Sequence, residues 1–243
     1  VERSRGLGDV YKREGRDGLF SGGFDLKTLA SGEMEKITMM VQLGYRLLLE
    51  LYSFDRPIIA AVSGHAIALG LFVTCSADYR IAIDGQYVCQ ANEVRNNMDI
   101  PPQIMEILKA RVNKNYFYPA VFHADTYSVQ DSIAVGYIDE VVSAEKFMDR
   151  VMEKANELAS LPHPFYANTK KSAQEDVREK IAEAIKNDGQ PAINYEIMKR
   201  QVDGLAEVAS SNQTKTLVVP TDITKALGTL ELFLDSLDKG KTN

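Results

Sequence analysis

The stretch RPIIAAVSGHAIALG, residues 56–70, decides how the rest of the chain folds. After the proline it runs through apolar or small residues from Ile58 to Ser63, a pattern typical of a strand buried on both faces. Gly64 ends this strand, and small residues then lead into an apolar helix from about Leu69 to Cys75. The start of a helix carries unpaired backbone N–H groups and the positive end of the helix dipole. The stretch therefore predicts a place that can hold negative charge.

The bulk composition indicates a soluble globular protein. Its 243 residues are 45% hydrophobic and 26% charged, enough for a sizeable core in one large or two small domains. The net charge of −6 argues against nucleic-acid binding, and no apolar run approaches the roughly 20 residues that span a bilayer. The charged N-terminus lacks the apolar core of a secretory signal. Cys75 and Cys89 form no CxxC pair, so we expect two buried free thiols and a reducing, cytoplasmic location.

The periodicity of apolar residues predicts alternating strands and helices. Residues 1–16 show no pattern and form a poorly specified lead-in. Residues 33–51 repeat apolar side chains every three or four positions, which is typical of an amphipathic helix. Further strands are expected at 78–83, 87–89, 137–142 and 215–219, and further helices at 101–111, 116–122, 128–135, 143–158, 165–186, 191–209 and 221–237. This order argues for an α/β fold with parallel crossovers.

Two glycine-rich turns are the strongest candidates for a site, FSGG at 20–23 and GHAIALG at 64–70. If they face each other, the backbone N–H groups of Gly22 and Leu69 converge on one oxygen atom. Such a pair stabilises an enolate-like oxyanion, each donor being worth about 3 kcal/mol in a site that excludes water. Neither turn matches the GxxxxGK[ST] or GxGxxG pattern, which disfavours nucleoside triphosphate chemistry. The alternative is that both turns only pack backbone closely against backbone.

Five motifs occur in order at suitable distances, FSGGFDL, RPIIAAVSGHAIALG, ADYRIA, NEV and SVQDSIAVGYIDEVV. Over about residues 15–162 the chain thereby resembles the crotonase (enoyl-CoA hydratase/isomerase) family. The resemblance implies a ClpP/crotonase-type spiral of strand–strand–helix (ββα) turns, usually assembled as trimers. It also implies an acyl-CoA thioester substrate. Because coenzyme A is then part of the substrate, no separate cofactor is expected.

The resemblance also implies roles for individual residues. It assigns the two oxyanion donors to the backbone N–H groups of Gly22 and Leu69. It places the substrate along the two turns and the helix that follows, at Phe20, Ser21, Phe24, Asp25, Leu26, Ala68 and Phe72. No metal site is expected, because the three histidines show no metal-ligand spacing. His65, within the second turn, is expected to be a spectator.

Hydratases of the family use two glutamates, and this sequence matches one of them. The first glutamate position holds Phe72, which cannot carry a proton, and the second holds Glu93. One carboxylate is poorly equipped both to activate water and to deliver a proton, whereas moving a double bond needs only one base. The run DYRIAIDGQYVCQANEV also resembles the single-glutamate Δ3,Δ2-enoyl-CoA isomerases. We therefore expect an isomerase in which apolar neighbours such as Phe72 and Val88 raise the pKa of Glu93. Hydration of a 2-enoyl-CoA is the alternative reaction, and a solvent-exposed loop acid is the alternative for Glu93.

The chain also departs from the family pattern. The family normally has strands before the FSGG turn, whereas only residues 1–16 precede it here, so we expect an N-terminally truncated acyl-CoA domain at 17–165. Asn96 and Asn97 stand where the family has a glycine-containing turn. From about 173 to 237 the chain resembles the C-terminal part of stomatin/band-7 (SPFH) proteins. We therefore expect residues 166–243 to be a mostly helical segment with one short strand that forms homo-oligomer contacts. The alternative from another class is a non-catalytic oligomeric scaffold.

Overall fold

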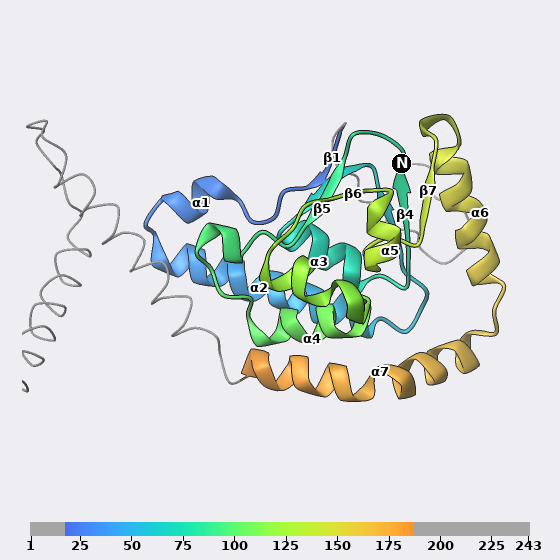
Figure 1. Cartoon of the computed structure of the whole chain (residues 1–243). Helices are drawn as coiled ribbons and strands as arrows, with labels where there is room; N and C mark the ends of the chain where they lie inside the picture. The colour runs from blue at the N-terminus through green and yellow to red at the C-terminus, as the bar shows by residue number, and fades with distance from the viewer. Residues whose placement is uncertain (1–17, 187–243) are drawn as a thin grey trace, which may run out of the picture. The chain divides into compact units, whose positions relative to one another are not determined.

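The chain changes sheets at Ser63, in the middle of the 56–70 stretch. In the computed structural model, which describes residues 18–186, β2 (Ile59–Val62) pairs in parallel with β4 (Tyr79–Ile83). β4 also pairs in parallel with β7 (Glu140–Val142), which completes a three-stranded sheet. One residue after β2, β3 (Gly64–Ile67) enters a second sheet of order β1–β3–β5–β6 (Figure 1).

The second sheet explains a strand that the sequence pattern missed. We expected only small residues between Gly64 and the following helix, but they form β3. Its neighbours β1 (Gly18–Ser21) and β5 (Val88–Gln90) both pair with it in parallel, so each edge of β3 has hydrogen-bond partners. β6 (Tyr127–Ser128) then pairs with β5 in the antiparallel direction. A Cβ on Gly64 would lie 2.1 Å from the carbonyl carbon of Gly18, so only glycine allows β1 to approach this closely.

Two successive ββα units follow each other along the chain. The first is β2–β3–α3 (Leu69–Ser76) and the second is β4–β5–α4 (Pro102–Arg111), with the first strand of each unit in one sheet and the second strand in the other. This confirms the expected α/β spiral of the ClpP/crotonase type. The remaining helices are α1 (Leu26–Ala30), α2 (Met34–Ser53), α5 (Asp131–Val135), α6 (Phe147–Ala159) and α7 (His163–Lys186), with short 3-10 turns η1 (Val94–Asn96), η2 (Lys114–Tyr116) and η4 (Ala144–Lys146).

The core lies around α3, which packs against both α2 and α4. Leu71, Phe72 and Cys75 on α3 are each no more than 1% exposed. Cys75 and Cys89 are both buried free thiols, as expected, and burial raises their pKa to about 11 and about 12. The helix that begins at Leu69 is therefore anchored in the apolar core.

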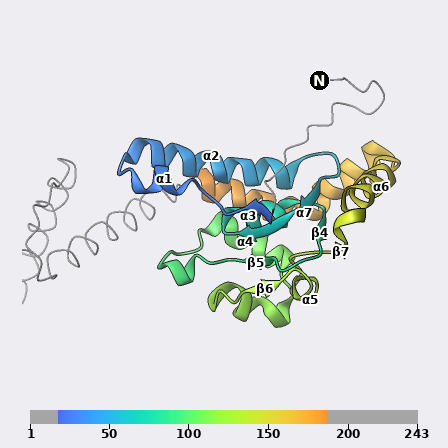
Figure 2. The same cartoon turned by 90° about the horizontal axis from the view of Figure 1, so that it is seen from above.

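α7 is part of the same packed unit as the elements before it. It runs along α2 and α4 in both views (Figures 1 and 2), and it belongs to the same compact unit as those helices. Lys170 on α7 forms a buried ion pair with Asp78 (2.7 Å), Arg178 donates a hydrogen bond to Ser53 (3.0 Å), and Ile181 is fully buried. The boundary that we expected between residues 165 and 166 thus falls inside α7. Sequence composition suggested a break there, whereas these long-range contacts join the two sides.

The segment expected to be one helix at 116–122 has a different geometry. It consists of η2 followed by a π-helical turn, η3 (Tyr118–Phe122). Pro119 has no backbone N–H to donate, so an ordinary helical ladder is interrupted at this position. The His123 N–H instead donates to the Tyr118 carbonyl (3.1 Å) and the Asp125 N–H to the Pro119 carbonyl (3.0 Å).

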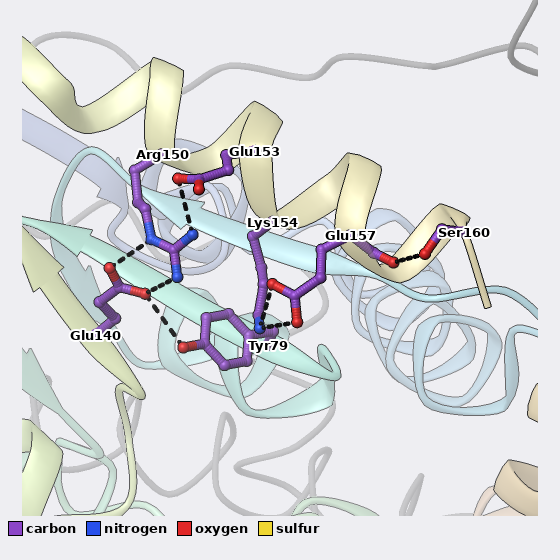
Figure 3. A network of polar contacts seen from close by, with 7 residues as sticks. All are labelled: Tyr79, Glu140, Arg150, Glu153, Lys154, Glu157 and Ser160. Atoms are coloured by element: carbon purple, nitrogen blue, oxygen red, sulfur yellow. Dashed lines mark hydrogen bonds and ion pairs between the residues drawn. The ribbon is translucent and has the colours of Figure 1, made fainter.

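A polar network fastens α6 to the three-stranded sheet (Figure 3). The Arg150 guanidinium donates to both carboxylate oxygens of Glu140 on β7, at 2.7 and 3.0 Å. The Tyr79 hydroxyl on β4 donates to the same carboxylate (3.1 Å), and the Lys154 ammonium lies 4.5 Å above the Tyr79 ring. The guanidinium hydrogen bonds hold the pKa of Glu140 below its usual value. The network therefore fixes α6 over two neighbouring strands.

The predictions for the two chain ends lie outside the described residues. These are the lead-in at 1–16, the missing strands before β1, the helices at 191–209 and 221–237, and the strand at 215–219; they stay predictions. Within residues 18–186, no helix is both long enough and apolar enough to cross a membrane.

Candidate active site

The two glycine-rich turns touch each other. β1 ends at Ser21 beside Ala66 of β3, after an irregularity in the pairing between Leu19 and Ser21. A Cβ on Gly23 would lie 3.0 Å from the Ala68 Cβ and 3.4 Å from the Leu69 nitrogen. A Cβ on Gly70 would lie 2.3 Å from the Ser21 carbonyl oxygen. The structure thus brings the FSGG turn against the first residues of α3.

The backbone at this junction adopts conformations that ordinary residues avoid. Gly23 has φ +102°, which suits glycine, and Ala68 has φ 53° with ψ −128° immediately before α3. The Ala68 N–H donates to the Gln90 carbonyl at 3.0 Å, so the end of β5 holds this strained residue in place. At the other end of α3, Arg111 donates to the carbonyls of Cys75 (2.9 Å) and Ala77 (2.6 Å). The helix that carries Leu69 is therefore held at both ends.

The amides of Gly22 and Leu69 are free to bind a ligand. Within residues 18–186, neither N–H donates a hydrogen bond to another group of the chain. A Cβ on Gly22 would have no atom within 4 Å, so this residue borders open space. Two unpaired donors on adjoining turns are the arrangement that an oxyanion site requires. Whether they bind one oxygen together stays a prediction.

Glu93 follows β5 and is buried, not an exposed loop acid. It comes three residues after Gln90, whose carbonyl accepts from the Ala68 N–H just before α3. Its side chain is 7% exposed, and it is the only buried carboxylate among residues 18–186. Burial raises the pKa of Glu93 to about 7, and its Oε2 atom has no hydrogen-bond partner. A carboxyl group with this pKa can accept and return a proton near neutral pH.

The loop after Glu93 is closed by backbone hydrogen bonds. The N–H groups of Asn96 and Met98 both donate to the Glu93 carbonyl, each at 2.9 Å. Asn97 has φ 54°, a left-handed conformation that asparagine tolerates better than most non-glycine residues. Asparagine thus supplies here the backbone geometry for which glycine was expected.

Five of the other expected substrate residues lie at three places in the structure. Ala68 and Phe72 lie at the start of α3 and on its buried face, where Phe72 is 1% exposed and supplies no acid–base group. Phe20 and Ser21 are half-buried on β1, and Ser21 Oγ accepts from the Gly23 N–H (3.2 Å). Phe24 is half-buried next to α2, where a Cβ on Gly44 would lie 2.5 Å from its ring.

Two expected substrate residues point outward in this structure. The Asp25 carboxylate accepts from the backbone N–H and hydroxyl of Thr28, both at 2.8 Å, and so caps α1. These hydrogen bonds lower the pKa of Asp25. Leu26 is 75% exposed. His65 uses Nδ1 to accept from the Val88 N–H (3.2 Å), in keeping with a structural role.

The sequence pattern missed three buried polar side chains near the candidate site or on its flanking elements. Tyr45 on α2 is 7% exposed, although its hydroxyl sets it apart from the aliphatic residues that mark the buried face of that helix. Asn92 and Gln103 carry buried side-chain atoms without a hydrogen-bond partner. Position 45 lies one helical turn from both Val41 and Leu48, so helical spacing alone could have placed it on the buried face.

Comparisons with known proteins agree with this geometry. Residues 13–206 match the family model described as enoyl-CoA hydratase/isomerase. The chain is 26% identical to enoyl-CoA delta isomerase 3 of Arabidopsis thaliana over 159 residues, which cover 63% of this chain and 67% of that protein. It spans only 55% of the length of other curated relatives.

Two solved structures from mycobacteria are similar over most of the chain. One is an enoyl-CoA hydratase from Mycobacterium ulcerans Agy99, with 38% identity, a TM-score of 0.67, and coverage of 72% of this chain and 75% of that one. The other is a protein from Mycobacterium tuberculosis that is described as an enoyl-CoA isomerase in one structure and as a probable enoyl-CoA hydratase in another; the first of these has 36% identity, a TM-score of 0.67, and coverage of 72% and 76%.

Proposed function

The chain belongs to the enoyl-CoA hydratase/isomerase family, and from this premise we propose that it moves the double bond of a 3-enoyl-CoA to the 2-position. The observation that carries the proposal is the number of buried carboxylate groups at the site. Glu93 is the only buried carboxylate among the described residues, and the buried Phe72, where the family resemblance implies a second glutamate, carries no ionisable group. A double-bond shift needs a single group that takes a proton from one carbon and returns it to another.

In the proposed mechanism the thioester carbonyl binds to the N–H groups of Gly22 and Leu69. These donors withdraw electron density from the carbonyl and acidify the neighbouring carbon, C2. Glu93 removes a proton from C2, the electrons shift to give a dienolate, and the negative charge rests on the thioester oxygen. Each backbone donor contributes about 3 kcal/mol to stabilising that charge. Glu93 then returns the proton to C4, which leaves the double bond between C2 and C3.

The raised pKa of Glu93 predicts how the reaction depends on pH. The base must be ionised, so kcat/KM is expected to rise with pH through the pKa of about 7 and to level off above it. The test is to incubate the protein with a 3-enoyl-CoA and, separately, with crotonyl-CoA, next to Glu93→Gln. Isomerisation that the variant loses supports the proposal. Hydration without isomerisation, or unchanged activity of Glu93→Gln, contradicts it.

Hydration of a 2-enoyl-CoA is the second candidate. Its support is the 38% identity to the Mycobacterium ulcerans protein, which is described as a hydratase. This reaction would have to use Glu93 for both the water and the α-carbon. The crotonyl-CoA arm of the same experiment distinguishes the two reactions directly.

We also propose a cellular setting and an assembly. The two buried free thiols fit a reducing compartment such as the cytoplasm. Homo-oligomer formation, through residues that resemble the stomatin/band-7 C-terminal part, is proposed for the segment after α7. A non-catalytic scaffold would show the same assembly but no turnover of either thioester.

A further inference from the structure

The loop that carries Glu93 is hydrogen-bonded on both sides to one turn, His123–Asp125, which we call the anchor turn. On the side before Glu93, the side-chain amide of Gln90 donates to the carbonyl of Ala124 in the middle of the anchor turn (2.8 Å). The backbone carbonyl of Gln90 accepts from the Ala68 N–H (3.0 Å), directly before α3. Gln90 therefore connects the anchor turn with the second candidate oxyanion turn.

On the side after Glu93, Arg95 makes the other two hydrogen bonds. Its Nε atom donates to the His123 carbonyl and its Nη2 atom donates to the Asp125 carboxylate, both at 3.1 Å. The side chains of this ion pair are 56% and 44% exposed, and an exposed ion pair contributes little to stability. What the contact fixes is geometry, because it holds the loop from the side opposite to Gln90.

The anchor turn is itself held in place. The N–H groups of His123 and Asp125 donate to two carbonyls of η3, at 3.1 and 3.0 Å. Ala124 is fully buried and has φ 51°, a conformation that residues other than glycine keep only when the surrounding structure enforces it. The three acceptors for Gln90 and Arg95 therefore stand at fixed positions.

The position of the Glu93 carboxylate depends on the backbone that carries it. The Oε2 atom is buried and has no hydrogen-bond partner, so no contact fixes the carboxylate at that atom. The backbone is closed on itself, since the N–H groups of Asn96 and Met98 both donate to the Glu93 carbonyl at 2.9 Å. Gln90 and Arg95 join this closed loop to the anchor turn.

We propose that Gln90 and Arg95 are positioning residues, which set the place of Glu93 relative to the oxyanion turns by tying its loop to the anchor turn. They act through the backbone, and neither side chain contacts the substrate. The inference rests on the proposed role of Glu93 as the base. When either contact is lost the loop moves, and a displaced base slows the chemical step without weakening substrate binding.

The test uses Gln90→Met and Arg95→Met, which keep an unbranched side chain and remove the donors. The matched control is Arg46→Met on α2, where an equally exposed arginine pairs with Glu50 at 3.6 Å. Three measurements are made on each protein. They are amide hydrogen exchange over residues 91–98, kcat and KM with a 3-enoyl-CoA, and urea unfolding to check that the fold is retained.

In Gln90→Met and Arg95→Met we expect the amides of Asn96 and Met98 to exchange about tenfold faster, because the loop opens more often. We expect kcat to fall about tenfold while KM stays within about twofold. Arg46→Met should match the unaltered protein in both respects. Asp125→Ala should reproduce the loss of Arg95→Met, and the double variant should lose no more than Arg95→Met alone, because the two residues act through one contact.

Several outcomes overturn the inference. Unchanged amide exchange in Gln90→Met and Arg95→Met refutes it whatever the activity. A rise in KM alone refutes it too, because the side chains would then contact the thioester. Equal changes in Arg46→Met would show a general effect of removing a surface side chain, and multiplied losses in the double variant would show that Arg95 does not act through Asp125.

A parallel Glu93→Gln arm separates this inference from the proposed function. If Glu93→Gln stays active, the proposed function fails, and the exchange measurement still decides whether the anchor turn holds the loop. If Glu93→Gln is inactive while Gln90→Met and Arg95→Met keep kcat, only the positioning role fails.

Discussion

Replacing Gly70 by alanine tests whether contact between the two turns creates the site. The added Cβ would lie 2.3 Å from the Ser21 carbonyl oxygen, and ordinary contact begins at 3.4 Å, so the two must separate by about 1.1 Å. Backbone stands on both sides, because Gly70 lies inside α3 and Ser21 ends β1. The separation would move the Gly22 N–H away from the Leu69 N–H.

A misplacement of about 1 Å in a catalytic arrangement lowers the rate about 100-fold, so we expect a loss of that size in kcat/KM for Gly70→Ala. Overpacking of this kind also destabilises a fold by about 1–3 kcal/mol. The matched control is Gly136→Ala at the end of α5, where the Cβ would lie 2.6 Å from the Arg111 carbonyl oxygen and φ is +91°. This control is expected to lose similar stability but to keep kcat/KM.

The assay combines isomerisation of a 3-enoyl-CoA with urea unfolding of the same preparations. Activity is expressed per folded protein, so that partial unfolding does not imitate a damaged site. The reasoning is refuted if Gly70→Ala keeps kcat/KM within about threefold of the unaltered protein. It is equally refuted if Gly136→Ala loses as much activity as Gly70→Ala, because the loss would then follow stability.

Three further predictions concern stability and assembly. Burial raises the pKa of Glu93 from 4.5 to about 7, so the folded state binds the proton more tightly and the free energy of unfolding falls by up to about 3 kcal/mol as the pH rises through that window. Glu93→Gln should therefore stabilise the protein at pH 8 and not at pH 4. Equal effects on urea unfolding at both pH values would contradict this prediction. Lys170→Ala removes the ammonium group that lies 2.7 Å from the half-buried Asp78 carboxylate and should lower the free energy of unfolding in urea by about 3 kcal/mol. The control Lys171→Ala, at the exposed neighbouring position, should lower it little, and equal losses would show that this ion pair does not hold α7 in place. Deleting residues 190–243, which form a unit separate from the one that holds the candidate site, should leave the melting temperature of that first unit unchanged and lower the mass of the oligomer in sedimentation. An unchanged number of subunits would contradict the assembly role proposed for residues 190–243.

Local chemistry predicted those parts of the fold that depend on neighbouring residues. The helix expected at 33–51 is α2, and the apolar helix expected after the GHAIALG turn is α3, because apolar spacing along a helix follows from its own periodicity. β3 escaped prediction because its small residues have weak strand preference of their own. It forms because β1 and β5 lie on its two edges. The same difficulty applies to α7, whose charged surface suggested a separate segment although Lys170 and Ile181 are buried.

The sequence by itself determined the chemical groups of the candidate site. The glycines allow the turns, Glu93 is the proposed base, and Phe72 stands where the family resemblance implies a second carboxylate. Only the tertiary structure decided that the FSGG turn meets the start of α3 and that Glu93 is buried enough to raise its pKa to about 7. Proximity and desolvation depend on which segments pack together over long stretches of chain, and residue order does not reveal that directly. The GHAIALG turn thus carries one proposed donor, and its contact with residues more than forty positions earlier forms the candidate site.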